Sequence, residues 1–201
     1  MNKVYKISAL GLIIFSIITF QAATAQVVYK LTNEKSSMTI DGTSTLHDWS
    51  STVNELEGQF ELPAKAAKKL ENGAAIEKVK IYAVVKSIES GRGSTMDNRT
   101  HDALKADEHP KVMFELTQGT IDQLKGNEFV VNATGNLNIA GSSKPIVMKV
   151  TGKKVDENTF RFSGSKDIDM TEFKVDPPTA MFGQIEAGKD VAIKFDLVFS
   201  R

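Results

Sequence analysis

A polar stretch, residues 96–110, contains two of the three histidines of the chain, His101 and His109, together with Arg99. Histidine can transfer protons or bind a metal, and arginine can hold a phosphate or a carboxylate. Asp97 lies four residues before His101 and could share a helix face with it, which we interpret as a solvated ion pair. No two histidines have the spacing of a helical zinc pair and the chain has no cysteine, so we expect no metal site.

A second group, residues 43–49, places the only tryptophan, Trp49, beside His47 and Asp48. A tryptophan is large and amphipathic, so it either caps the edge of a core or lines the mouth of a ligand pocket. A hydrolase or isomerase would need His47, Asp48 and His101 to meet within hydrogen-bonding distance in one cleft. The chain contains no Gly-x-Ser-x-Gly nucleophile motif. We therefore expect a protein that is not an enzyme, with no catalytic residues and no cofactor.

The first 25 residues have the pattern of a secretory signal peptide. Lys3 and Lys6 precede a short apolar run, residues 9–20, and Ala23-Thr-Ala25 supplies a cleavage site of small residues. The run is shorter than the roughly 20 residues of a membrane-spanning helix, although an uncleaved anchor stays an alternative. We expect cleavage near Ala25, a periplasmic or secreted location, and one domain over residues 26–201.

The charge balance of this domain argues against a nucleic-acid partner. The signal segment holds two of the 25 basic residues and none of the 25 acidic ones, so the remainder carries 23 against 25. A net charge near −2 does not supply the basic patch that nucleic acid requires. Without cysteines the domain has no disulfides, and its 176 residues are enough to bury a core that holds one domain.

Apolar and polar residues alternate along most of this domain, which is the pattern of antiparallel strands with one buried face. The clearest apolar sets are Val191/Ile193/Phe195/Leu197/Phe199, Phe129/Val131/Ala133/Leu137/Ile139, Ile146/Met148/Val150, Val112/Phe114/Leu116 and Val79/Ile81/Ala83/Val85. Shorter sets are Tyr29/Leu31, Met38/Ile40, Leu56/Phe60 and Phe160/Phe162. Gly135 interrupts one set and predicts a bend or a bulge.

Two segments are predicted to be helical. Residues 63–70 form a short connecting helix, and a helix capped by Ser94 or Thr95 and ended before Pro110 brings Met96, Thr100, Ala103 and Leu104 to one side. A mainly β domain with eight or more antiparallel strands removes its edges by closing into a barrel, and a β-sandwich is the alternative. An eight-stranded barrel is either filled by side chains or holds one slender ligand, and the alternation fits both.

Several short motifs appear in an order that resembles the YceI-like family of exported bacterial proteins. These motifs are Thr45-Leu-His-Asp-Trp49, Gly58-Gln-Phe60, Met96-Asp-Asn-Arg99, His109-Pro-x-Val-x-Phe114, Met170-Thr-x-Phe173, Pro177-Pro-Thr179, Phe182-Gly183 and Gly188-Lys-Asp-Val191. The resemblance implies a lipocalin-like, eight-stranded antiparallel barrel with a helical insertion, a long tunnel for a polyisoprenoid chain, and no established catalysis. Many members have Phe-Phe-Asp where Leu104-Lys-Ala-Asp107 stands here, so the ligand preference can differ.

The expected partner is therefore a polyisoprenoid or another long-chain amphiphile, held for transport or storage. Each buried methylene contributes about 0.8 kcal/mol to binding, and a phosphate head group would need arginine or lysine donors. The expected ligand-binding residues are Trp49, Arg92, Met96, Arg99, His101, Leu104, Phe114, Phe129 and Phe182. A packed-core stress-response or structural module without a ligand is the alternative function. A homodimer is compatible with the sequence.

Overall fold

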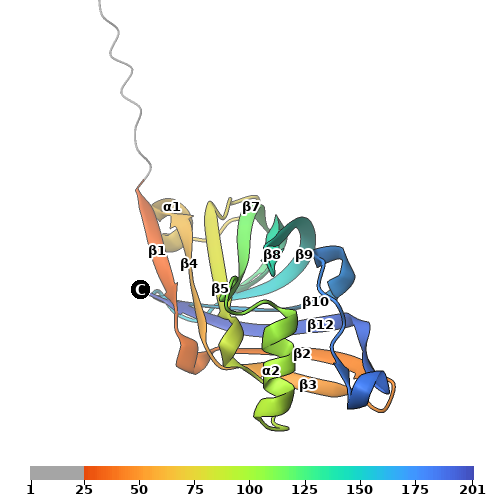
Figure 1. Cartoon of the computed structure of the whole chain (residues 1–201). Coiled ribbons are helices and arrows are strands. Elements are labelled where there is room, and N and C mark those ends of the chain that lie inside the picture. Colours follow the sequence, from red (N-terminus) through yellow and green to blue (C-terminus); the bar gives the residue numbers. More distant parts are fainter. Residues whose placement is uncertain (1–24) are drawn as a thin grey trace, which may run out of the picture.

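The computed structural model describes residues 25–201 and consists of a strongly curved β-sheet with two short α-helices (Figure 1). The expected signal peptide lies outside the described residues, apart from Ala25. The strands are β1 (Gln26–Leu31), β2 (Ser37–Ser44), β3 (Trp49–Val53), β4 (Leu56–Pro63), β5 (Lys78–Val84), β6 (Ile88–Glu89), β7 (Lys111–Lys125), β8 (Glu128–Ile139), β9 (Ser142–Lys154), β10 (Thr159–Asp169), β11 (Thr179–Ala180) and β12 (Ile185–Ser200). The helices are α1 (Ala64–Lys68) and α2 (Ser94–Ala103), with four short 3-10 turns.

Within residues 25–201, eight antiparallel strands close into a barrel in the order β1-β4-β5-β7-β8-β9-β10-β12. The closure is made by β1 and β12, where Leu31 pairs with Phe199. The alternating sets predicted from the sequence lie on these strands, and the expected mainly β, eight-stranded antiparallel barrel is confirmed. The β-sandwich alternative is wrong because one continuous sheet returns to its own first strand.

The strands that form the barrel wall differ at one end. The long strand β12 pairs with β1 near its C-terminus but with β2 over Ala187–Asp196, and β3 and β6 then extend the sheet from β2. The segments that connect β1 to β2, β3 to β4 and β5 to β6 lie side by side. Asn33 links two of them, because its amide donates to the Asn54 carbonyl oxygen and accepts from the Leu56 amide. At this end β6 pairs with β3 and has no ladder to β7.

The helix α2 connects β6 to β7 and lies over β2 and β3 in Figure 1. The predicted helical insertion is therefore present, beginning at Ser94 and ending at Ala103. The short connecting helix is also present, and a bulge lies on β7 opposite Gly135, between Leu116 and Gln118. The sequence patterns did not predict β3 and β6, which are short and contribute few apolar residues.

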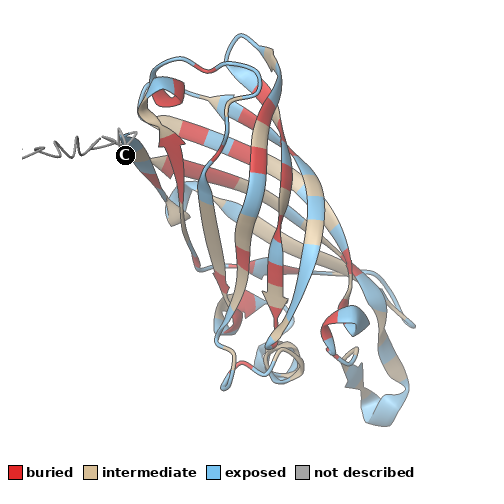
Figure 2. Ribbon diagram, turned by 90° about the horizontal axis from the view of Figure 1, so that it is seen from above, coloured by how far each residue is buried: buried red, intermediate tan, exposed pale blue. Residues whose placement is uncertain are grey.

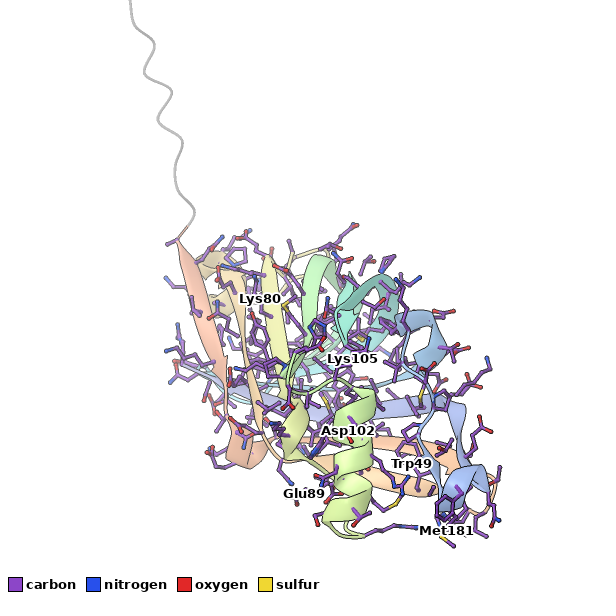
Figure 3. All side chains as sticks on the ribbon, in the orientation of Figure 1. Trp49, Lys80, Glu89, Asp102, Lys105 and Met181 are labelled. Atoms are coloured by element: carbon purple, nitrogen blue, oxygen red, sulfur yellow. The ribbon has the colours of Figure 1, made fainter. Side chains whose placement is uncertain are left out.

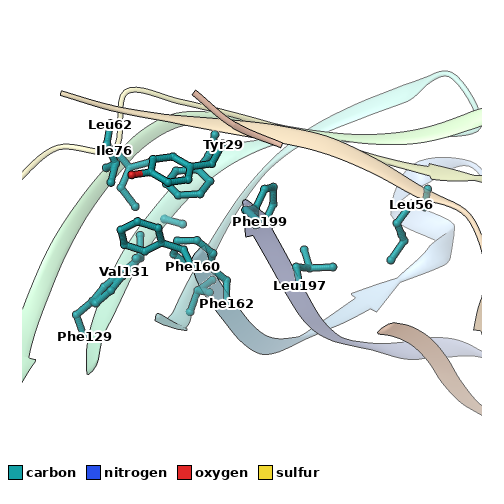
Figure 4. Packing of buried hydrophobic residues seen from close by; sticks show 14 of the residues in the cluster. Tyr29, Leu56, Leu62, Ile76, Phe129, Val131, Phe160, Phe162, Leu197 and Phe199 are labelled. Atoms are coloured by element: carbon teal, nitrogen blue, oxygen red, sulfur yellow. The ribbon is translucent and has the colours of Figure 1, made fainter. Parts of the chain in front are cut away.

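The two ends of the barrel have different interiors. One end is filled by six aromatic side chains whose ring centroids lie 4.8–6.4 Å apart (Figure 4). They are Tyr29, Phe60, Phe129, Phe160, Phe162 and Phe199. We call this half of the barrel the packed half, and buried residues are densest on the strands near the C-terminus in Figure 2. The end made by β2, β3, β6 and α2 is the hollow half, because it surrounds a cavity.

Candidate functional site

The hollow half contains an internal cavity of about 360 Å³, which is within the size range of small-molecule binding sites. Its wall is formed by inward-facing residues of the strands together with one face of α2. Strand residues in the wall include Met38, Ile40, Val53, Ala83, Val112, Ile139, Ile168, Val191 and Ile193, and helix residues include Met96, Ala103 and Leu104. The wall also contains eight polar or charged residues, among them Ser51, Thr100 and Arg99. Because most of the wall is nevertheless apolar, the cavity suits a hydrocarbon group rather than a polar substrate.

The cavity lies where the ladder of eight strands opens at one end. Inward side chains can fill a barrel of eight strands, but here β2, β3 and β6 add a separate sheet edge and α2 occupies the gap before β7. The helix presents small or unbranched side chains at Ala103 and Met96.

Trp49 begins β3 and lies in the cavity wall. Its indole nitrogen donates a hydrogen bond of 2.7 Å to the Thr43 carbonyl oxygen, which fixes the ring orientation. The ring lies against Gly42, its pairing partner on β2, where a Cβ atom would be 2.4 Å from Trp49 Cζ2. A glycine at this position therefore allows the indole to lie flat on the neighbouring strand. The two positions predicted for Trp49 were the edge of a core and the wall of a pocket, and both agree with this arrangement.

Two arginines stand at the open end of the cavity. Arg99 on α2 donates to the Thr179 carbonyl oxygen on β11, so it bridges two sides of the opening. Its Nε atom is buried and has no hydrogen-bond partner within residues 25–201. Arg92 contacts the His47 ring through Nη1, and in this part of the chain neither arginine lies within 4.0 Å of a carboxylate. An anion at the opening could therefore accept hydrogen bonds from both guanidinium groups.

A hydrogen-bonded carboxylate fastens the loop that carries Arg92. Asp97, in the first turn of α2, accepts from the Ser90 amide at 2.8 Å and from the Ser90 hydroxyl at 2.6 Å. These bonds lower the pKa of Asp97, the hydroxyl contributing most. The expected surface ion pair between Asp97 and His101 is not the main contact of either residue, because the His101 ring is hydrogen-bonded to the Ile88 carbonyl oxygen.

On the other side of the cavity, Asp169 fixes the turn that carries Met170. Its carboxylate accepts from the Thr171 amide at 3.0 Å and from the Thr171 hydroxyl at 2.6 Å, and it pairs with Lys189. The bond from Lys189 contributes most to lowering its pKa, from 3.8 to about 2. The turn thereby holds the Met170 side chain in the cavity wall.

Five of the nine expected ligand-binding residues lie in the cavity wall, and these are Trp49, Arg92, Met96, Arg99 and Leu104. His101 does not, because its ring points to the backbone of β6. The sequence pattern did not single out Met38, Ile40, Ile168 or Ile193 as cavity residues. Their alternation showed that they face inward, but it could not show which inward positions border empty space.

The three expected phenylalanines are not among the residues that line this cavity. Phe129 belongs to the packed half and lies against Gly152, and Phe114 is packed against Gly135. Phe182 is fully exposed, at 108 %, in a turn in which Met181, Phe182 and Gly183 all have positive φ. These three consecutive left-handed residues direct its ring away from the cavity. The neighbouring Met181 is labelled at the edge of the molecule in Figure 3.

The residues that could have formed a catalytic site do not form one hydrogen-bonded group. The His47 ring contacts the Asp48 carbonyl oxygen and Arg92, whereas His101 contacts Ile88. The proposed meeting of His47, Asp48 and His101 is therefore not present. Among residues 25–201 no group of three or more His, Cys, Asp or Glu side chains could hold a metal ion. In the same range, no helix has the length and apolar character needed to cross a membrane.

The fold and the cavity define a small antiparallel β-barrel with an apolar chamber at one end. A model of the YceI-like domain matches residues 29–199, and the chain belongs to this family. No curated protein matches the sequence.

Solved structures share the fold at low sequence identity. Burkholderia cenocepacia BcnA is 21% identical, with a TM-score of 0.65 over 84% of this chain and 98% of that chain. A polyisoprenoid binding domain from Saccharophagus degradans, implicated in plant cell wall breakdown, is 12% identical, with a TM-score of 0.65 over 86% and 97%. A Campylobacter jejuni YceI protein is 18% identical, with a TM-score of 0.53 over 75% and 84%.

Proposed function

We propose that this protein is a non-enzymatic carrier that binds one amphiphilic lipid of the isoprenoid type. The apolar tail lies in the cavity of the hollow half and the polar head lies at its opening. The observation that carries this proposal is an internal chamber with a mostly apolar wall whose opening is flanked by Arg92 and Arg99. Membership of the YceI-like family, and the barrel shared with a polyisoprenoid binding domain, support it.

The opening determines which head group fits. Arg99 and Arg92 present guanidinium donors without carboxylate partners in the described chain, so we infer an anionic head group such as a phosphate or diphosphate. His101 is not part of this head-group site, since its ring bonds to the Ile88 backbone. Trp49, Met96 and Leu104 then contact the tail.

The proposed place of action is outside the cytoplasm, in the periplasm or after secretion. The support is the pattern of residues 1–25, with its two lysines, apolar run and small-residue cleavage site near Ala25. A carrier in an aqueous compartment would shield a lipid tail from water during transport or storage, and the cavity needs no partner protein to do so. The homodimer stays a prediction.

The test compares farnesyl diphosphate with farnesol, which has the same tail and no charge. Trp49 is the only tryptophan and lies in the cavity wall, so its fluorescence reports binding without a label. Arg99→Gln and Arg92→Gln should each weaken diphosphate binding about tenfold, because a charge-assisted hydrogen bond contributes about 1.5–3 kcal/mol. Both variants should leave farnesol binding unchanged.

The matched control is Arg161→Gln, which removes an arginine that pairs with Asp196 outside the cavity. This variant should bind both compounds as the wild type does. If neither compound changes Trp49 fluorescence, and protein purified from its own host carries no lipid by mass spectrometry, the proposed function is wrong. Equal loss of both compounds in the arginine variants would refute the head-group assignment alone.

A further inference from the structure

The cavity has a floor, which lies where the hollow half meets the packed half. Along β12, Val191 and Ile193 line the cavity, whereas Leu197 and Phe199 are buried in the packed half. On the opposite wall the cavity residue Ala83 pairs with Leu56, which is also buried in the packed half. Leu56 and Leu197 are not among the cavity-lining residues, and Phe195 lies between Ile193 and Leu197 on the same face of β12. The lining therefore ends at Ile193 on β12 and at Ala83 on β5, before the aromatic cluster.

The packed half offers no continuation of the cavity. Phe60 stacks on Tyr29 at 4.8 Å and meets Phe160, Phe162 and Phe199 edge to face at 5.2–5.4 Å. None of these rings lines the cavity. Figure 4 places Leu197 beside Phe199, with Leu56 farther from the rings and Phe129 at the opposite side. The cavity open to a tail therefore extends to Ile193 and Ala83, with the buried Leu197 and Leu56 behind them.

The volume of the chamber sets the length of that tail. A cavity of about 150 Å³ lined by apolar side chains holds one benzene molecule, so each carbon needs roughly 25 Å³. The 360 Å³ available here then accommodates about 14 carbon atoms on that scale. This capacity corresponds to a farnesyl chain and is far below that of a long polyprenyl chain.

We propose that this protein is selective for amphiphiles with a short isoprenoid tail, about the length of a farnesyl group, and that Leu56 and Leu197 form the floor that sets this limit. The proposal rests on the proposed function and narrows its ligand class. A chamber of this length differs from the long tunnel that the family resemblance implied, because the cavity lies in one half of the barrel.

The experiment measures the affinity of the full chain for geranyl, farnesyl and geranylgeranyl diphosphate by Trp49 fluorescence. Each buried methylene strengthens binding about fourfold, so farnesyl should bind at least about tenfold more tightly than geranyl. The added unit of geranylgeranyl has no space to enter, and its affinity should differ from that of farnesyl by less than about threefold. In a competition at equal concentrations read by native mass spectrometry, a long polyprenyl diphosphate should gain no advantage over farnesyl diphosphate.

Two variants should change the maximum length of the bound tail in opposite directions. Ala83→Leu fills part of the chamber and should weaken farnesyl binding about tenfold while changing geranyl binding by less than about threefold. Leu197→Ala opens the floor and should make geranylgeranyl the tightest ligand. Phe129→Leu is the matched control, since it also removes volume in the packed half but away from the floor. Thermal unfolding by circular dichroism confirms that each variant is folded.

Affinity that keeps rising through geranylgeranyl and the long polyprenyl chain would overturn the length limit and leave the proposed lipid carrier intact. An Ala83→Leu variant that binds all three diphosphates like the wild type would also overturn it, and this test holds even where Leu197→Ala fails to fold. If no diphosphate binds, the proposed function fails, and the length limit fails with it.

Discussion

The packed half and the hollow half of the barrel are made from the same alternating strands, and β12 runs through both. In the packed half, β1 closes the ladder and six aromatic rings fill the interior. In the hollow half, β2, β3 and β6 replace β1 and α2 takes the place of a strand. The difference indicates that the elements that form the wall, as well as the apolar residues of the strands, decide where the barrel interior is filled.

The two halves correspond to two interiors that the sequence left as alternatives. A packed core without a ligand describes one half, and a chamber for an apolar tail describes the other. The packed half can hold the barrel together without disulfides, so the hollow half can leave space unfilled. Four predictions test this division.

The largest effect is expected in the packed half. Phe60→Ala removes a ring that contacts four other aromatic rings and should lower the free energy of unfolding by about 3–5 kcal/mol. The matched change in the hollow half, Met96→Ala at the cavity opening, should cost less than about 0.5 kcal/mol. Denaturant titrations measure both. Similar losses in the two halves would show that the hollow half contributes equally to stability, contrary to the comparison.

The second prediction concerns the wall of the hollow half. Gly42→Ala places a Cβ atom 2.4 Å from the Trp49 ring, which must move, at a cost of about 1–3 kcal/mol. The Trp49 emission spectrum should change with it. Thr52→Ala, on the outward face of β3, is the control and should leave both stability and emission unchanged. An unaltered spectrum in Gly42→Ala would mean that the indole does not lie on β2.

The third prediction sharpens the description of the packed half. The Tyr29 side chain is completely buried, its hydroxyl has no hydrogen-bond partner within residues 25–201, and burial raises its pKa. Tyr29→Phe removes this unpaired group and should stabilise the protein by about 1 kcal/mol. Tyr82→Phe, at a partly exposed ring, should change stability by less than about 0.5 kcal/mol. A clear loss in Tyr29→Phe would reveal a hidden partner for the hydroxyl.

The smallest effect is the pH dependence of the hollow half. Because the pKa of Asp169 is lowered in the fold from 3.8 to about 2, the unfolded chain binds this proton first as the pH falls. The stabilising contribution is complete above about pH 5 and is lost progressively as the pH falls toward about 2. Asp169→Asn should therefore show a flatter fall in Tm over this range. Parallel Tm curves for the two proteins would contradict this role for Asp169.

Particular residues show how far the sequence could predict the site. The order of short motifs predicted the family, the barrel and the helical insertion, and Arg99, Met96 and Leu104 were expected at the ligand. Phe114 and Phe129 have the same alternating pattern as Ile40 and Ile193, yet only the latter pair borders the cavity. An inward position is a property of local periodicity, whereas empty space beside it depends on strands far apart in the chain.

The sequence by itself determined the period-two strands, the absence of disulfides and the helix inserted before β7, because these follow from residue type and local spacing. Only the folded chain shows that β12 changes partners from β2 to β1, and that α2 packs between β6 and β7 beside a cavity. These features depend on register between distant segments, which alternation along one strand does not encode. The size of the cavity is therefore a property of the assembled barrel.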